Sequence, residues 1–195
     1  MGGSTLPLRF TPSPLPVPFS TPYSLLRTAP VLQATYTCLA PIYDALVPHI
    51  SSQARSAGRR QLAVREGEQV LDVGTGTGLT FKRLVAANPT GWTEGVDRTP
   101  AMLQRARQRM WDVPHACYGL RLADATALPY PDDTFDAVLS TYLIDVLPSQ
   151  YQSPVLQEMR RVLRPAGRVV LVYLAPPRQG VEYLWNALCK SVSPL

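Results

Sequence analysis

Three glycines on alternate positions constrain the fold of this chain more than any other feature. They lie in V-L-D-V-G-T-G-T-G, which begins at residue 70. The apolar run 69–73 predicts a buried strand and the apolar spacing over 79–85 predicts a helix, so the glycines occupy a strand-to-helix turn. Glycine tolerates positive φ and has no Cβ, so the backbone can approach a ligand here while the helix directs free N–H groups at it. The sequence therefore predicts a bound phosphate or carboxylate at this turn.

The spacing of the glycines separates two kinds of nucleotide cofactor. The G-x-G-x-x-G fingerprint of dinucleotide-binding folds needs its third glycine where this chain has Leu79, which argues against NAD. A G-x-G-x-G turn with an acidic residue two positions before its first glycine resembles motif I of the class I S-adenosylmethionine-dependent methyltransferases. A turn that merely joins strand and helix is the structural alternative. The resemblance implies that S-adenosylmethionine is bound by Asp72, Gly74, Thr75, Gly76 and Gly78.

A second motif follows at the end of the next expected strand. A nucleoside held over a parallel sheet needs a carboxylate there to accept from both ribose hydroxyls. The strand predicted over 92–96 is followed by Asp97, and Thr99 and Pro100 then suit the start of a helix. The stretch G-V-D-R-T-P-A-M-L resembles the family's second motif. By that resemblance Asp97 binds the ribose while Arg98 and Met102 flank the adenine, although core packing explains Met102 equally well.

A third motif, L-A-D-A-T-A-L-P-Y from residue 122, resembles the family's segment after its third strand. The resemblance implies that Asp124 accepts a hydrogen bond from the adenine amino group. The backbone N–H of Ala125 would then serve a ring nitrogen. An ordinary role for Asp124 as a turn residue is the alternative.

Two later segments complete the expected sheet. F-D-A-V-L-S (135–140) resembles the family's fourth strand and places Ser140 at the reacting end of the cofactor. R-V-L-R-P-A-G-R-V-V-L-V-Y (161–173) resembles the turn and fifth strand, with Pro165 and Gly167 ending a helix. The predicted fold class is α/β, a Rossmann-like doubly wound sheet of about five parallel strands. The resemblance runs from about residue 36 to the end and is closest to the broad group that includes the ubiquinone and menaquinone biosynthesis enzymes.

The two ends of the chain differ from this pattern. Seven of the twenty prolines lie within residues 1–30, which predicts a disordered tail ahead of a methyltransferase domain over 31–195. Helices are expected over 35–47 and 51–64. By resemblance to a lid in relatives, Tyr43 would close the methionine end of the site and Tyr36 would line the substrate pocket; packing alone explains both equally well.

The family fold also has two further strands after the fifth, which this chain is expected to lack. Residues 181–190 suit one helix instead. The strand over 169–172 would then present a bare apolar edge, an arrangement that favours association. We therefore expect self-association through this edge or marginal stability.

The chemistry of a sulfonium methyl group requires few catalytic residues. The donor is already a strong electrophile, so alignment of donor and acceptor and exclusion of water contribute most. A base helps where the acceptor is an acidic carbon, a phenol or a thiol, and Asp145 in S-T-Y-L-I-D-V-L is the candidate, with Tyr142 beside the substrate. Asp145 alternatively balances the sulfonium charge, binds substrate or caps a helix. Many relatives carry histidines at this point.

Composition excludes several other classes of function. No run of about eighteen apolar residues is present, so no membrane span is expected. The net charge of +5 comes from scattered arginines, which favours a solvated surface over a nucleic-acid site. Three scattered cysteines and two histidines predict neither a disulfide framework nor a metal site, and a cytoplasmic location is expected. Three interpretations remain: a small-molecule methyltransferase, a non-catalytic or truncated S-adenosylmethionine-binding protein, and a Rossmann oxidoreductase.

Overall fold

A five-stranded parallel sheet forms the centre of the molecule, in the computed structural model that describes residues 52–113 and 118–173. The strand order is β3-β2-β1-β4-β5, and every neighbouring pair is parallel. The strands are β1 (Gln69–Val73), β2 (Trp92–Asp97), β3 (Tyr118–Leu122), β4 (Phe135–Thr141) and β5 (Leu163–Val172). This order confirms the predicted α/β, doubly wound architecture.

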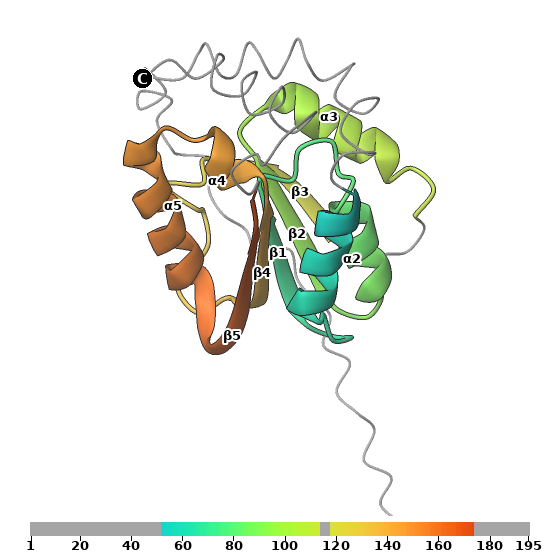
Figure 1. The fold of residues 1–195 in the computed structure, drawn as a ribbon. Coiled ribbons are helices and arrows are strands. Elements are labelled where there is room, and N and C mark those ends of the chain that lie inside the picture. The colour runs from blue at the N-terminus through green and yellow to red at the C-terminus, as the bar shows by residue number, and fades with distance from the viewer. Residues whose placement is uncertain (1–51, 114–117, 174–195) are drawn as a thin grey trace, which may run out of the picture.

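Helices cover both faces of the sheet (Figure 1). The helices are residues 52–62, α2 (Phe81–Ala87), α3 (Pro100–Arg109), α4 (Leu143–Val146) and α5 (Ser149–Val162). Figure 1 shows α4 and α5 on one side and the helix 52–62, α2 and α3 on the other. Because both faces are covered, the central strands β1 and β4 are mostly buried and largely apolar, as is usual for parallel sheets.

Three apolar clusters fill the spaces between sheet and helices, and the third joins Phe81 and Val85 of α2 to Met110 after α3. On the α5 side, Val73 and Val138 pack with Val155 and Met159 of the helix. On the other side, Val70, Ala137 and Leu139 pack with Leu62 and Leu84. Val155, Met159 and Val162 form the buried face of α5, and Leu163 at the start of β5 is buried as well.

The strand order reverses between β1 and β4. From β1 the chain continues outward through β2 and β3, and it then returns to place β4 on the other side of β1. At such a reversal the connections leave the two central strands in opposite directions, which opens a crevice at their carboxyl ends. The glycine turn after β1 and the segment after β4 meet at this crevice.

The turn expected at Pro165 and Gly167 lies inside β5 instead of ahead of it. Leu163 is opposite Phe135 and Arg168 is opposite Ala137, so a two-residue step along β4 faces a five-residue step along β5. The extra residues form a bulge, and Figure 1 shows the ribbon bending sharply there before it runs alongside β4. The expectation that Pro165 and Gly167 end the helix is therefore wrong, because α5 ends at Val162 and both residues lie in the bulged part of β5.

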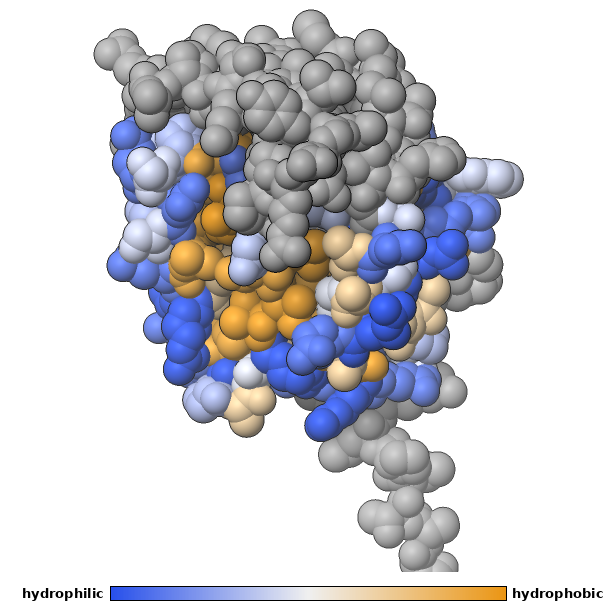
Figure 2. All heavy atoms as spheres, viewed as in Figure 1, coloured by the Kyte–Doolittle hydropathy of each residue, from blue (hydrophilic) through white to orange (hydrophobic). Residues whose placement is uncertain are grey.

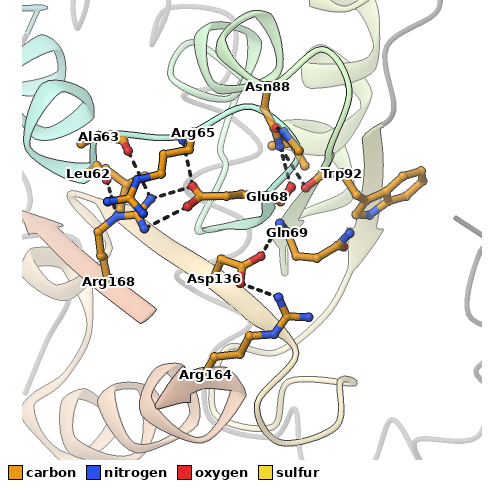
Figure 3. A network of polar contacts seen from close by, with 12 residues as sticks. Leu62, Ala63, Arg65, Glu68, Gln69, Asn88, Trp92, Asp136, Arg164 and Arg168 are labelled. Carbon is orange, nitrogen blue, oxygen red and sulfur yellow. Dashed lines mark hydrogen bonds and ion pairs between the residues drawn. The ribbon is translucent and has the colours of Figure 1, made fainter. Parts of the chain in front are cut away.

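A polar network ties the segments together at the amino ends of the strands (Figure 3). Arg168 contacts both carboxylate oxygens of Glu68, at 3.0 and 2.6 Å, and donates to the Leu62 carbonyl oxygen at 2.7 Å. Asp136 accepts from the Gln69 N–H at 2.8 Å. These contacts fix the helix 52–62 and β5 against β1 and β4 at the end of the sheet opposite the crevice.

Several expectations concern residues outside those described. The Pro-rich tail over 1–30, the helix over 35–47, Tyr36 and Tyr43 precede residue 52. The expected absence of two further strands concerns residues after 173.

Candidate cofactor site

The three glycines of the turn after β1 all have positive φ, as the sequence predicts. The φ values are +77° for Gly74, +58° for Gly76 and +81° for Gly78. Gly78 also has a packing role, because a Cβ there would lie 3.0 Å from both Cα and Cβ of Ala106. The last glycine of the turn thus lets α3 pack directly on the backbone.

The N–H groups of the turn bond to the protein itself, which differs from the expected anion site. Gly74 and Thr75 both donate to the Val96 carbonyl oxygen, at 2.9 and 3.0 Å. Gly76 donates to Oδ2 of Asp97 at 2.8 Å, and Gly78 donates to the Thr75 carbonyl oxygen at 3.1 Å. The helix α2 begins only at Phe81. The described turn is therefore fixed by the end of β2, and these four groups are not presented to a phosphate.

Asp97 joins the glycine turn to the start of α3. Its Oδ2 accepts from Gly76 and its Oδ1 accepts from the Thr99 N–H at 2.8 Å. Burial raises the pKa of Asp97, while the hydrogen bonds from Thr99 and Gly76 act in the opposite direction. Each carboxylate oxygen can accept a second hydrogen bond. Asp97 is thus fixed in position and retains the capacity to accept from a diol.

Asp72 is a buried carboxylate without a hydrogen-bond partner. Its side chain is fully buried at the carboxyl end of β1, and neither of its carboxylate oxygens is bonded. The Thr75 hydroxyl donates to the Asp72 backbone oxygen at 3.0 Å instead. Burial, with a smaller contribution from the nearby Asp97, raises the pKa of Asp72 to about 7, while the Thr75 side chain acts in the opposite direction. A buried polar group that lacks a partner is costly, and a cation or N–H donor bound beside it would remove that cost.

The segment after β3 begins next to Asp97. The Ala123 N–H donates to the Asp97 carbonyl oxygen at 3.1 Å, so Asp124 and Ala125 follow directly. Oδ1 of Asp124 accepts from the N–H and the hydroxyl of Thr126, at 2.9 and 2.7 Å. Asp124 therefore has the turn role that the alternative interpretation gave it. The structure brings the second and third motifs together, and an adenine contact stays a prediction.

Arg98 and Met102 differ in their surroundings. Met102 is 3% exposed on α3, among the buried residues of the core, which fits the packing explanation. Arg98 is half-buried, and its Nε is buried without a partner. Contacts of Arg98 and Met102 with adenine stay predictions.

The end of β4 contributes residues from the other side of the crevice. The buried Ser140 hydroxyl donates to the Val73 carbonyl oxygen at 2.9 Å and so links β4 to β1. Tyr142 has a φ of +61°. Leu143 of α4 lies over Gly74, because a Cβ added to Gly74 would be 3.1 Å from the Cβ of Leu143. Asp145 is half-buried inside α4, whose N-cap position is Tyr142, so Asp145 is not the capping residue.

Sequence reasoning missed a charged pair on α5 that holds the segment after β3. Arg161 donates from Nε and Nη2 to the two carboxylate oxygens of Glu158, at 2.6 and 2.7 Å. It also donates to the carbonyl oxygens of Leu128 and Tyr130, at 3.0 and 2.7 Å. The only sequence signal is an acid and an arginine three positions apart on a helix, which is common on solvated surfaces.

Comparison with known proteins identifies relatives over most of the described region. Residues 70–167 match the family described as a methyltransferase domain. A demethylmenaquinone methyltransferase of Tropheryma whipplei (strain Twist) is 37% identical over 140 residues, which cover 72% of this chain and 56% of that protein. A phosphatidylethanolamine N-methyltransferase of Cereibacter sphaeroides is 36% identical over 135 residues, covering 67% of this chain and 62% of that protein. This chain thus spans about half to two thirds of the length of these relatives.

A solved structure shares the fold. The DhpI–SAM–HEP complex matches with a TM-score of 0.63 and 24% identity, covering 82% of this chain and 70% of that one. Among residues 52–113 and 118–173, no helix is long and apolar enough to cross a membrane. The same residues contain no group of three or more potential metal ligands.

Proposed function

The chain belongs to the class I S-adenosylmethionine-dependent methyltransferases, and we propose that it transfers a methyl group from S-adenosylmethionine to a small-molecule acceptor. The supporting observation is the buried Asp72 carboxylate without a partner, beside a glycine turn in which four N–H groups bond to the protein itself. A phosphate would be repelled by this carboxylate. A ligand with cationic ammonium and sulfonium groups would be attracted.

The other cofactor groups fit the remaining side chains. The Asp97 carboxylate has four lone-pair sites, so beside its bonds from Gly76 and Thr99 it has acceptor capacity left for the ribose hydroxyls. Asp124 and Ala125 follow the contact between Ala123 and Asp97, so they would meet the adenine attached to that ribose. Residues 31–195 would form the catalytic domain, preceded by the tail at 1–30.

The cofactor supplies the electrophilic methyl group, and this chain orients the reactants. Leu143 lies over Gly74, so α4 covers the turn that would hold the methionine part of the cofactor. Asp145 and Tyr142 lie in or next to α4 and are the proposed base and substrate contact. A carboxylate here would remove a proton from an acidic ring carbon or a phenol as the methyl group is transferred.

The names of the relatives indicate two classes of methyl acceptor. The Tropheryma whipplei relative is named for demethylmenaquinone and the Cereibacter sphaeroides relative for phosphatidylethanolamine. We propose a quinone-type ring as the first acceptor to test. The second candidate function is a binding protein that holds S-adenosylmethionine without transfer, which is favoured by Asp145 at the point after β4 where many relatives carry histidines.

We further propose self-association through the outer edge of β5, and a cytoplasmic location. Among the described residues β5 pairs with no strand on its outer side. Val169 is 47% exposed on this strand, and Figure 2 shows apolar surface where Figure 1 places β5. An exposed apolar edge favours pairing with another chain. Light scattering that finds a monomer over a wide concentration range would contradict this proposal.

Calorimetric titration with S-adenosylmethionine and S-adenosylhomocysteine tests the proposed function. The wild-type chain should bind both with micromolar affinity, and Asp97→Ala should lose most of that binding. Glu66→Ala, at an exposed position ahead of β1, is the control and should bind normally. Circular dichroism establishes that each variant is folded. A folded wild-type chain that binds neither compound would refute the proposal; binding without transfer to any of a broad set of acceptors would favour the second candidate.

A further inference from the structure

The segment between β3 and β4 (residues 123–134) has no helix or strand of its own, and its position depends on other elements. Its first residue is held by the hydrogen bond from Ala123 to Asp97. The turn formed by Asp124 to Ala127 follows, closed by the Ala127 N–H on the Asp124 carbonyl oxygen at 3.1 Å. Whatever fixes the chain after this turn also fixes where Asp124 and Ala125 lie.

Glu158 and Arg161 of α5 provide this second anchor. Both backbone groups of Leu128 are bonded to the pair: its N–H donates to Oε2 of Glu158 at 2.7 Å, and its carbonyl oxygen accepts from Nη2 of Arg161 at 3.0 Å. Leu128 is the residue directly after the turn, so the charged pair and Asp97 hold the turn from its two ends.

Arg161 uses its whole guanidinium group in this role. Nη1 donates to the Tyr130 carbonyl oxygen at 2.7 Å and to Oδ1 of Asp132 at 2.8 Å. With the two bonds to Glu158 and the bond to Leu128, all five N–H donors of Arg161 have acceptors. Hydrogen bonds from Arg161 lower the pKa of Glu158, so the pair is ionised at neutral pH. A lysine has three donors without the planar geometry, so it cannot reproduce these contacts.

The rest of the segment also has anchors that do not involve the side chains of this pair. The Tyr130 hydroxyl donates to Oε1 of the buried Glu94 at 3.1 Å, and its ring packs edge-on against Phe135 at 5.0 Å. The Asp133 and Thr134 N–H groups donate to backbone oxygens at the end of α5. A variant of the pair should therefore shift the turn while the segment stays attached.

We propose that Glu158 and Arg161 are positioning residues that align Asp124 and Ala125 with the adenine edge, and so set the preference of the site for adenine. This rests on the proposed function. Neither residue touches the reacting atoms. Their effect should appear as a change in selectivity between bases that differ only at the edge facing Asp124.

The test compares S-adenosylhomocysteine with S-inosylhomocysteine, in which a carbonyl oxygen replaces the adenine amino group. Binding of both to the wild-type chain, Arg161→Lys and Glu158→Gln is measured by calorimetry. The wild-type chain should prefer the adenine compound. Each variant should bind it about tenfold more weakly, the loss expected for one hydrogen bond. Affinity for the inosine compound should change little, so the preference falls.

Arg160→Lys is the matched control, because Arg160 is the adjacent arginine of α5 and donates to the Leu163 carbonyl oxygen, outside the segment. It should keep the wild-type preference. If the pair had a purely structural role, its variants would bind both compounds more weakly by the same factor. That result, or an unchanged preference in a folded variant, would overturn this inference and leave the proposed function standing. If Arg161→Lys does not fold, the binding preference of Glu158→Gln tests the inference in its place. A wild-type chain that binds neither compound would refute the proposed function and this inference together.

Discussion

The Gly76 N–H donates to Oδ2 of Asp97 at 2.8 Å, so the residue expected to hold the ribose also fixes the glycine turn. Removing the carboxylate should therefore have two effects. Asp97→Ala leaves the Gly76 and Thr99 N–H groups without acceptors and should lower the free energy of unfolding by about 1–3 kcal/mol. Urea denaturation of the cofactor-free chain measures this loss. Unchanged stability would show that the turn does not depend on Asp97.

Asp72 should make the stability of the cofactor-free chain depend on pH. Its pKa is about 7 in the folded chain against an ordinary value of 3.8, so the folded state holds its proton more tightly than the unfolded state does. The stabilisation from this proton is complete below about pH 4 and is lost as the pH rises to about 7. Asp72→Asn removes this dependence. The variant should gain stability relative to wild type between pH 5 and pH 8, by up to a few kcal/mol, since one pKa unit corresponds to about 1.4 kcal/mol.

Binding of S-adenosylmethionine should show the opposite dependence on pH. A cation beside Asp72 favours the ionised carboxylate, so the affinity of the wild-type chain should rise between pH 6 and pH 8 and binding should release a proton near pH 7. Titrations in two buffers with different ionisation enthalpies measure that proton. Asp72→Asn should bind more weakly and lack the Asp72 contribution to both effects. Equal proton release in the two chains would exclude Asp72 as the partner of the cation.

Two glycine substitutions should separate backbone strain from packing. Gly78 and Gly67 both have positive φ, +81° and +89°, so alanine is strained at either position by roughly 1 kcal/mol. A Cβ at Gly78 would also lie 3.0 Å from Ala106, whereas one at Gly67 has nothing within 4 Å. Gly78→Ala should therefore cost roughly 1–3 kcal/mol more than Gly67→Ala in thermal or urea unfolding. Equal losses would mean that α3 moves away without cost.

The network in Figure 3 should contribute to stability without affecting the cofactor. Glu68→Gln breaks the ion pair with Arg168, whose carboxylate contacts are 3.0 and 2.6 Å. The free energy of unfolding should fall by about 1–3 kcal/mol. Affinity for S-adenosylhomocysteine should stay within twofold of wild type, because the network lies at the amino ends of the strands. A large loss of affinity would place this network in communication with the cofactor site.

Local patterns in the sequence determined the strand-turn-helix units and much of their order. The alternation of short apolar runs with helical spacing predicted the five parallel strands, and the position of Asp97 directly after a strand predicted its place at the sheet's carboxyl end. The positive φ of the three glycines followed in the same way. These features depend on residues close together in the chain, so they can be predicted from the sequence.

Tertiary structure alone decided which polar groups have partners. The N–H groups of Gly74, Thr75 and Gly76 bond to the end of β2, about twenty residues away, and the buried Asp72 carboxylate in the adjoining strand has no partner. The contacts of Arg161 with Leu128 and Tyr130, and the bulge that contains Pro165, are of the same kind. Each depends on which donors and acceptors the packed elements bring within about 3 Å, and no periodic pattern in the sequence carries that information.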